Sequence, residues 1–347
     1  MLTNLLAFLV LAATQIPADF SGSSPAVENV FGKVPDFFQR YDLILQPDVL
    51  EEGWWAGAPS LMRDSEGAFW MACRMRNTTD PRGLRGYEIR ILKSPDGIHF
   101  EKALSIAREA VPIPGFERPA LLRDPKTGNA KLYACGPWQG GPWSVIKFDD
   151  APAPDQFCAA SARPVITPFA KSYDHDVVPT EYKDPVILFA ENAYHCYVIG
   201  YLRKNERIYH FSSPDGEKWE PVGSPYESLM QLQGWHDFFV RPASVLSLGI
   251  GYLFVYEGSN VSWYEPVYNI GTGLGFSFDL HNIQDLTPQS PLLLSTTPSA
   301  AGHTWRYSSW LWVDGELWVY AEVAAESGIH EIRRFAVPVC KDKGVAR

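Results

Sequence analysis

The chain has 347 residues and a formal net charge of −10. Hydrophobic residues make up 46% and charged residues 20%, which is typical of a globular protein with a large core, and no basic stripe favours nucleic acid as a partner. Aromatic residues reach 14%, with 12 tryptophans, which suits either a core filled with large rings or a platform on which sugars stack.

The first 20 residues are a candidate secretory signal peptide. An apolar run covers residues 5–14, and the small residues Ala12, Ala13 and Ala18 follow near a cleavage point, although a basic N-terminal region is missing. The run is too short to cross a membrane as a mature helix, so we expect no stable membrane insertion after cleavage. We therefore expect a secreted or periplasmic protein, with a cytoplasmic one as the alternative. Residues 21–50 are interpreted as an N-terminal approach segment.

From residue 51 onward one pattern recurs five times, at intervals of about 60 residues. Each unit starts with an apolar run, followed by a turn and two further runs rich in β-branched and aromatic residues. Such a repeat in an all-strand sequence predicts a five-bladed β-propeller, with four-stranded antiparallel blades around a central funnel. We expect one propeller domain over 51–340, with blades at about 54–104, 115–150, 180–220, 238–280 and 303–337. The equivalent opening positions are predicted to be Pro59, Pro119, Pro185, Pro242 and Tyr307.

Three of the five cysteines, Cys73, Cys135 and Cys196, fall in the predicted second strands of the first three blades. Cysteines in different blades lie too far apart for a disulfide, so we expect buried free thiols. No cysteine or histidine spacing is typical of a zinc site, and we expect no bound metal at the functional site.

Two features of the repeat resemble a known group of enzymes. Lys183-Asp184-Pro185-Val186-Ile187 opens one unit, and Pro-Asp-Gly turns end strands at residues 95–97 and 214–216. With Phe116-Glu117-Arg118-Pro119, these resemble the five-bladed glycoside hydrolases of families 43, 32, 68, 117 and 130. Gly57-Ala58-Pro59 with Arg74 and Arg76 is most similar to family 130, the mannoside phosphorylases and hydrolases. In families 43 and 32 the first blade opens with an aspartate where this chain has Ala58. The resemblance implies no cofactor beyond a structural calcium in the channel, as in some relatives.

Glycoside cleavage needs one carboxyl group that protonates the leaving oxygen and a second that activates water or attacks the sugar. Glu117 and Asp184 precede buried strands at the openings of two blades, where a carboxylate is costly unless it is paired or functional. Glu257 ends a second strand, which returns to the face where first strands begin. We therefore predict Glu117, Asp184 and Glu257 as catalytic residues. The alternative for Glu117 and Asp184 is a solvent-facing charge paired with Arg118 or Lys183.

Further residues are expected at the same mouth. Glu322 ends a second strand as Glu257 does, and an ion pair between blades is its alternative role. His236 and Asp237 lie in a loop before the fourth blade, where a satisfied loop histidine is as good an interpretation. The predicted substrate-binding residues are Arg74, Arg76, Arg118, Lys183, His236, Asp237, Arg241, Trp55, Trp138, Trp235, Tyr307 and Glu322.

The leading hypothesis is an inverting glycoside hydrolase that acts on an oligo- or polysaccharide. A mannoside-type phosphorylase, in which phosphate replaces water, is a close alternative, and a non-catalytic carbohydrate-binding propeller is a second. A sialidase-like enzyme, with Arg118, Arg241 and Arg306 as a carboxylate-binding triad, is a third, but it would need a sixth blade.

Overall fold

The computed structural model describes residues 34–81, 83–168, 178–202, 205–261, 269–295, 297 and 303–338. The predicted signal peptide and the last residues of the predicted domain lie outside these ranges. No helix among the described residues is long and apolar enough to cross a membrane. The helices whose bounds lie within this part of the chain are short 3₁₀ helices: η2 (Val34–Phe38), η3 (Arg108–Ala110), η4 (Trp138–Gly140), η5 (Pro154–Gln156), η6 (Ala159–Ser161) and η7 (Gly234–His236).

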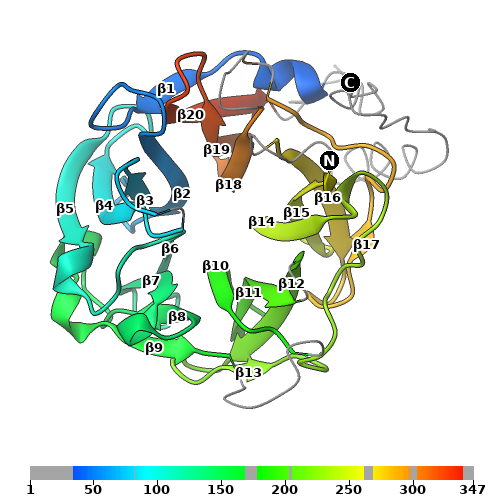
Figure 1. Ribbon diagram of the computed structural model, residues 1–347, viewed down its shortest axis with the longest axis horizontal. Coiled ribbons are helices and arrows are strands. Elements are labelled where there is room, and N and C mark those ends of the chain that lie inside the picture. The colour runs from blue at the N-terminus through cyan, green and yellow to red at the C-terminus, as the bar shows by residue number, and fades with distance from the viewer. Residues whose placement is uncertain are drawn as a thin grey trace, which may run out of the picture.

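The described strands form five antiparallel blades arranged in a ring around a central axis, as predicted (Figure 1). In each blade the first strand lies nearest the axis and the fourth at the rim. Blade one contains β2 (Trp55–Arg63), β3 (Phe69–Arg76), β4 (Gly86–Ser94) and β5 (Glu101–Ala107), and blade two contains β6 (Ala120–Arg123), β7 (Ala130–Pro137), β8 (Trp143–Lys147) and β9 (Arg163–Ile166). Blade three contains β10 (Tyr182–Ala190), β11 (Ala193–Leu202), β12 (Asn205–Ser213) and β13 (Glu220–Pro221), and blade four contains β14 (Phe239–Ser247), β15 (Tyr252–Ser259), β16 (Gly271–Ser277) and β17 (Gln284–Asp285). Blade five contains β18 (Trp305–Val313), β19 (Glu316–Ala324), β20 (His330–Pro338) and β1 (Asp42–Leu45).

The ring closes with a strand from the N-terminal side of the chain. β1 pairs antiparallel with β20 and so becomes the fourth strand of blade five. Residues 42–45 thus belong to the propeller, although the sequence pattern placed them in an approach segment. The fourth strand of blade two, β9, likewise lies beyond residue 150, where we expected blade two to end. Both strands are four residues long, which is too short for a clear alternating pattern.

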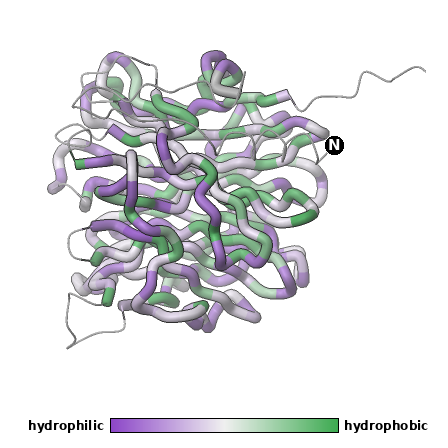
Figure 2. The backbone as a smooth tube through the Cα atoms, turned by 90° about the vertical axis from the view of Figure 1, so that its right-hand side faces the viewer, coloured by the Kyte–Doolittle hydropathy of each residue, from purple (hydrophilic) through white to green (hydrophobic). Residues whose placement is uncertain are grey.

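The core lies between the blades. Hydrophobic and hydrophilic residues intermingle along the strands (Figure 2), because each sheet buries both faces against its neighbours while its turns reach water. The largest cluster joins blades four and five, where Phe38 of η2 packs against Trp305, Trp310 and Phe335. The described cysteines Cys73, Cys135, Cys158 and Cys196 are free thiols.

Candidate active site at the propeller axis

A bulge interrupts the first strand of four blades near the axis. The pairing register skips at residues 58–59 in β2, 184–185 in β10, 243 in β14 and 307–308 in β18. At the first bulge position Ala58, Asp184 and Tyr307 all have positive φ, between 51° and 55°. Non-glycine residues rarely adopt this conformation, which is enriched at functional sites. The register makes Tyr307 equivalent to Pro242, as predicted, and also to Asp184, so the predicted alignment of Tyr307 with Pro185 is off by one residue.

The carboxylate of Asp184 is buried and held on both oxygens. Its Oδ1 accepts a hydrogen bond from the backbone N–H of Arg118 at 3.2 Å, and its Oδ2 accepts one from the Tyr307 hydroxyl at 2.8 Å. The backbone N–H of Asp184 also points at Cys135 Sγ, at 3.1 Å. Asp184 thus joins blades two, three and five, and it faces the axis rather than solvent, which differs from the alternative of a solvent-side ion pair with Lys183.

The guanidinium of Arg118 lies across the axis. Its Nη1 donates to the carbonyl of Pro242 at 3.0 Å, and its Nη2 donates to the carbonyls of Ala243 and Ser308 at 2.5 and 3.3 Å. Burial lowers the pKa of Arg118, against the opposing effect of the Glu257 and Asp184 carboxylates. The side chain therefore fills the centre of the channel and is committed to main-chain carbonyls of blades four and five.

Among the buried carboxyl groups at the axis, Glu257 has the fewest hydrogen-bond partners. It lies near the end of β15, opposite Arg241 of β14, and is fully buried. Its Oε1 accepts a long hydrogen bond of 3.4 Å from the Ser308 N–H, whereas Oε2 has no hydrogen-bond partner among the described residues. Burial raises the pKa of Glu257 to about 7, even though Arg118, Arg241 and Arg306 act in the opposite direction. Such a group can hold a proton near neutral pH and release it, as a general acid must.

Glu322, the equivalent residue of blade five, has the opposite environment. It accepts hydrogen bonds from Arg74 at 3.1 Å, from Arg306 at 2.8 and 3.0 Å, and from the Ala58 N–H at 3.1 Å, and His330 Nδ1 lies 2.7 Å away. Burial alone would raise the pKa of Glu322, but the nearby Arg306 and Arg74 bring this pKa well below its usual range. Both oxygens are occupied, so Glu322 is an ion-pair anchor between blades one and five and not the sugar ligand we predicted.

Glu117 is the predicted carboxylate that reaches the funnel surface. Its side chain is 12% exposed and pairs with Arg74, which lies between Glu117 and Glu322. Arg74 also faces the ring of Tyr307, 5.5 Å from the ring centre. Glu117 thus has a charged partner from blade one and one side open to water.

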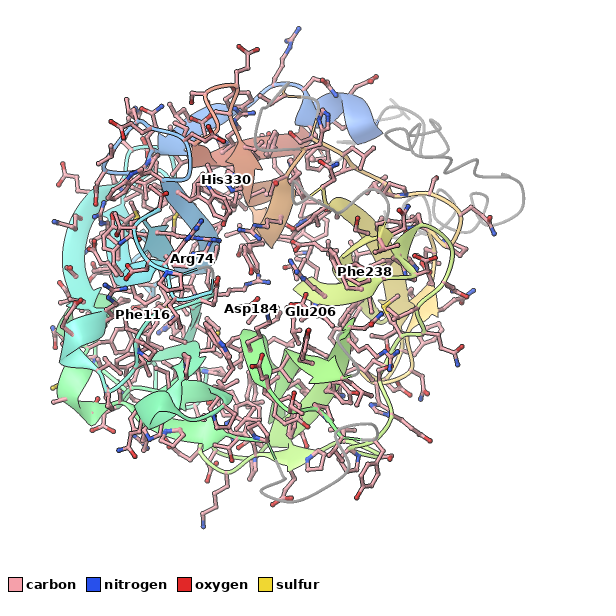
Figure 3. All side chains as sticks on the ribbon, in the orientation of Figure 1. Arg74, Phe116, Asp184, Glu206, Phe238 and His330 are labelled. Atoms are coloured by element: carbon pink, nitrogen blue, oxygen red, sulfur yellow. The ribbon has the colours of Figure 1, made fainter. Side chains whose placement is uncertain are left out.

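The sequence did not single out Glu206, which lies at the same mouth. It accepts a hydrogen bond from Arg241 and forms an ion pair with Lys183 at 2.7 Å. Burial alone would raise the pKa of Glu206, but these two cations lower this pKa to about 2. Glu206 is near the start of a third strand, a position that the repeat pattern did not identify with the funnel. Figure 3 shows Arg74 of blade one and Asp184 and Glu206 of blade three around the centre of the ring.

The predicted sugar-stacking tryptophans are occupied by protein contacts. Trp55 stacks on His330 at 3.8 Å, and Arg76 covers it with its guanidinium 3.8 Å from the ring centre. Trp235 is fully buried against Tyr256. Trp138 packs on the core between blades one and two. Trp55 and Trp235 present no free face to the funnel, whereas Trp138 is only partly buried, so its stacking role stays a prediction.

The two loop residues before blade four, His236 and Asp237, have different environments. His236 is buried and its Nε2 lies 3.0 Å from Asp285, an interaction within the blade, whereas Asp237 is exposed. The buried Nδ1 of His236 has no hydrogen-bond partner among the described residues, so the alternative of a satisfied loop histidine holds for one ring nitrogen only. Among the described residues there is no group of three or more His, Cys, Asp or Glu side chains suited to a metal. A structural calcium stays a prediction from the resemblance.

The three arginines of a sialidase-like triad do not converge on one ligand. Arg118 binds main-chain carbonyls, Arg241 binds Glu206 and Arg306 binds Glu322. The five blades that the described strands form also argue against this alternative.

Comparisons with known proteins support the architecture. No protein-family model matches the chain, and no curated protein is similar to it in sequence. Among solved structures, a complex of BT0996 with RGII has a TM-score of 0.66 at 13% identity, over 89% of this chain and 93% of that one. The β-1,2-mannobiose phosphorylase of Listeria innocua has a TM-score of 0.60 at 13% identity, over 88% of this chain and 95% of that one. A structure from the GH130 family of mannoside phosphorylases, described as containing glycoside hydrolases that target β-1,2 mannosidic linkages in Candida mannan, has a TM-score of 0.62 at 12% identity, over 87% of this chain and 96% of that one. At these identities the likeness shows the fold, which is the five-bladed propeller that carries glycoside-active enzymes.

Proposed function

We propose that this protein is a glycoside hydrolase whose reaction takes place at the axial mouth between Glu117, Asp184 and Glu257. The observation that carries the proposal is Glu257, a buried carboxyl group with a pKa of about 7 and one oxygen without a hydrogen-bond partner among the described residues. A glycosidase needs one carboxyl group that stays protonated beside a second that stays ionised. Two of the neighbouring structures named above, whose names give mannosides as substrates, support a carbohydrate as substrate.

The roles follow from the surroundings of each group. Glu257 is the general acid, which protonates the leaving glycosidic oxygen through Oε2. Glu117 is the base, because it is the partly exposed carboxylate and Arg74 keeps a cation beside it. Asp184 is a positioning residue, since it accepts hydrogen bonds from the Tyr307 hydroxyl and from the backbone N–H of Arg118. We propose inversion of the anomeric centre, in which Glu117 activates a water molecule on the far side of the sugar ring.

The test compares substrates that differ in leaving group. Replacement of Glu257 by Gln removes the proton donor, so kcat/KM on oligosaccharides should fall by about 10²–10⁴-fold. On aryl glycosides whose phenol leaves without protonation, the same variant should keep most of its activity. Glu117→Gln should lower the rate on both substrate types, because both need the activated water. Equal losses for Glu257→Gln on both substrates would contradict its role as acid.

The same assay separates hydrolysis from phosphorolysis and inversion from retention. Hydrolysis runs without added phosphate, whereas a phosphorylase releases a sugar 1-phosphate only in its presence. The anomer formed first, followed by NMR before mutarotation, distinguishes inversion from retention. Phosphate would have to compete with carboxylates already bound to Arg74, Lys183 and Arg241, which is why we favour water.

A non-catalytic carbohydrate-binding propeller is a second candidate, and burial favours it. Asp184, Glu257 and Glu322 are all at most 1% exposed, so a sugar meets fewer carboxylates than the sequence implied. This candidate predicts no turnover on any glycoside and equal sugar binding by the parent protein and Glu257→Gln, measured by calorimetry.

A further inference from the structure

A second hollow lies away from the axis, between the outer parts of blades three and four. It has a volume of about 530 Å³, within the range of about 300–1,000 Å³ of small-molecule sites. The strand β16 runs parallel to β14, so the residues after its end lie on the face opposite the mouth where the first strands begin. The polar residues that line the hollow are Ser224, Glu227, Ser228, His281, Asn282 and Gln284.

An aromatic ring stands at the edge of this groove. Phe278 is 72% exposed, which is the largest exposed fraction among the described large hydrophobic residues. Its edge-to-face contact with Phe276, at 4.7 Å and 86°, fixes the ring from one side and leaves a face open. A sugar can stack its C–H groups on an open ring face of this kind. Because the Phe278 side chain is already ordered in the free protein, binding costs little further side-chain entropy.

The polar side chains retain unused hydrogen-bonding capacity. Glu227 and Gln284 form no side-chain hydrogen bond or ion pair with the described residues. Asn282 donates its Nδ2 to Asp279 at 2.6 Å, which leaves its Oδ1 as an acceptor, and Ser228 donates to the Met230 carbonyl at 3.0 Å and can still accept. Carboxylate, amide and hydroxyl groups beside an open ring match the alternating hydroxyl and C–H surface of a sugar.

His281 is held in place from behind. Its Nδ1 lies 3.2 Å from Nδ1 of His210, whose Nε2 lies 2.9 Å from Nδ1 of His195. Burial lowers the pKa of His210 to about 3. His210 therefore stays neutral behind the groove, and its contact with His281 orients the His281 ring at the wall. The groove thus presents one carboxylate and mostly neutral groups, which suits a neutral ligand better than an ion.

We propose that this groove is a second, non-catalytic saccharide site, which binds a segment of a neutral glycan on the face opposite the catalytic mouth. Phe278 stacks on one sugar ring, while Glu227, Asn282 and Gln284 bind its hydroxyls. Because the two sites face opposite ways, the groove holds a different part of the glycan from the one at the mouth. The site anchors the protein to its polymer and takes no part in bond cleavage.

Affinity electrophoresis in native gels that contain yeast mannan, birchwood xylan or pectic galactan tests this site. The parent for the test is Glu257→Gln, so that turnover does not alter the polysaccharide. We expect retardation in at least one gel, and Phe278→Ala in that background should weaken it by about tenfold, the loss of about 1.4 kcal/mol. The matched control is Trp312→Ala, which removes a ring that is 40% exposed and lies outside the groove, and it should migrate like the parent.

Three results would overturn the inference. One is no retardation of the parent in any gel, and another is equal retardation of the parent and Phe278→Ala. The third is a dimer of the parent in light scattering that Phe278→Ala converts to a monomer, because the groove would then hold a second copy of the chain. In the active protein, Phe278→Ala should leave kcat/KM on a soluble aryl glycoside unchanged, so failure of the groove is distinguishable from failure of the proposed reaction.

Discussion

At the scale of single residues, one backbone position carries the chemistry of the axis. The bulge position holds Ala58, Asp184 or Tyr307 in three blades, all with positive φ. The left-handed conformation costs each non-glycine residue roughly 1–2 kcal/mol, and the surrounding strands hold it in place. It turns the Asp184 and Tyr307 side chains toward each other across the funnel, where their hydrogen bond forms.

The buried Glu257 leads to a prediction about the pH dependence of the free energy of unfolding. Burial raises its pKa from 4.5 to about 7 in the native state. Between these two values the folded chain binds more protons than the unfolded chain, so the free energy of unfolding decreases as pH rises through that window and is lowest above it. Glu257→Gln removes this penalty. We expect the variant to gain about 1–3 kcal/mol relative to the parent between pH 4.5 and pH 8, measured by urea unfolding across pH.

A constant difference between the two proteins over that pH range would contradict the raised pKa. Glu331→Gln serves as a control, because Glu331 is a buried carboxylate bound to Arg333 outside the funnel. Its stability difference from the parent measures the loss of a buried carboxylate outside the funnel.

The sequence located some of these residues and missed others for a physical reason. Glu257 was found because antiparallel strands return to the face where they began, which is a rule of topology. Glu206 was missed because its importance comes from Lys183 and Arg241, on two other strands. The roles predicted for Trp55 and Trp235 were wrong, since a ring's position along the chain does not reveal which side chains cover its faces.

At the scale of elements, the closure of the ring depends on β1 and on the 3₁₀ turn before it. The strand β1 pairs with β20, and Arg334 binds Asp42 at 2.5 Å across that pair. Such a partner is far away in sequence, so a local pattern of four residues could not reveal it. The main repeat was visible because each inner strand is long and bounded by turn residues.

Phe38 tests this closure. Its ring lies between 5.4 and 5.9 Å from those of Trp305, Trp310 and Phe335, so Phe38→Ala leaves a cavity where blades four and five meet. We expect a loss of about 3–5 kcal/mol in the free energy of unfolding. Leu43→Ala in β1, whose side chain is 46% exposed, should change stability by less than about 0.5 kcal/mol. Similar losses for both variants, measured in urea, would show that the turn does not seal the ring.

At the scale of the whole molecule, Arg118 connects the blades through their common axis. Its side chain comes from the opening of blade two and binds carbonyls of blades four and five, while its backbone N–H binds Asp184 of blade three. Four of the five blades thus meet at one residue. Arg118 therefore obstructs the axis, and within the proposed function we infer that a glycan enters and leaves at one end.

The guanidinium of Arg118 lies where three main-chain carbonyls converge and donates hydrogen bonds to all of them. Arg118→Ala removes the donor and leaves these carbonyls buried without partners, so we expect a loss of about 3–5 kcal/mol in the free energy of unfolding. Free guanidinium ion at millimolar concentration has the same planar donors and should restore part of the melting temperature of Arg118→Ala. Equal concentrations of sodium chloride should not, and the parent protein should gain nothing from either salt. If guanidinium fails to stabilise the variant while Arg118→Lys melts like the parent, the planar donor is not what joins the blades, and a single positive charge at the axis is sufficient.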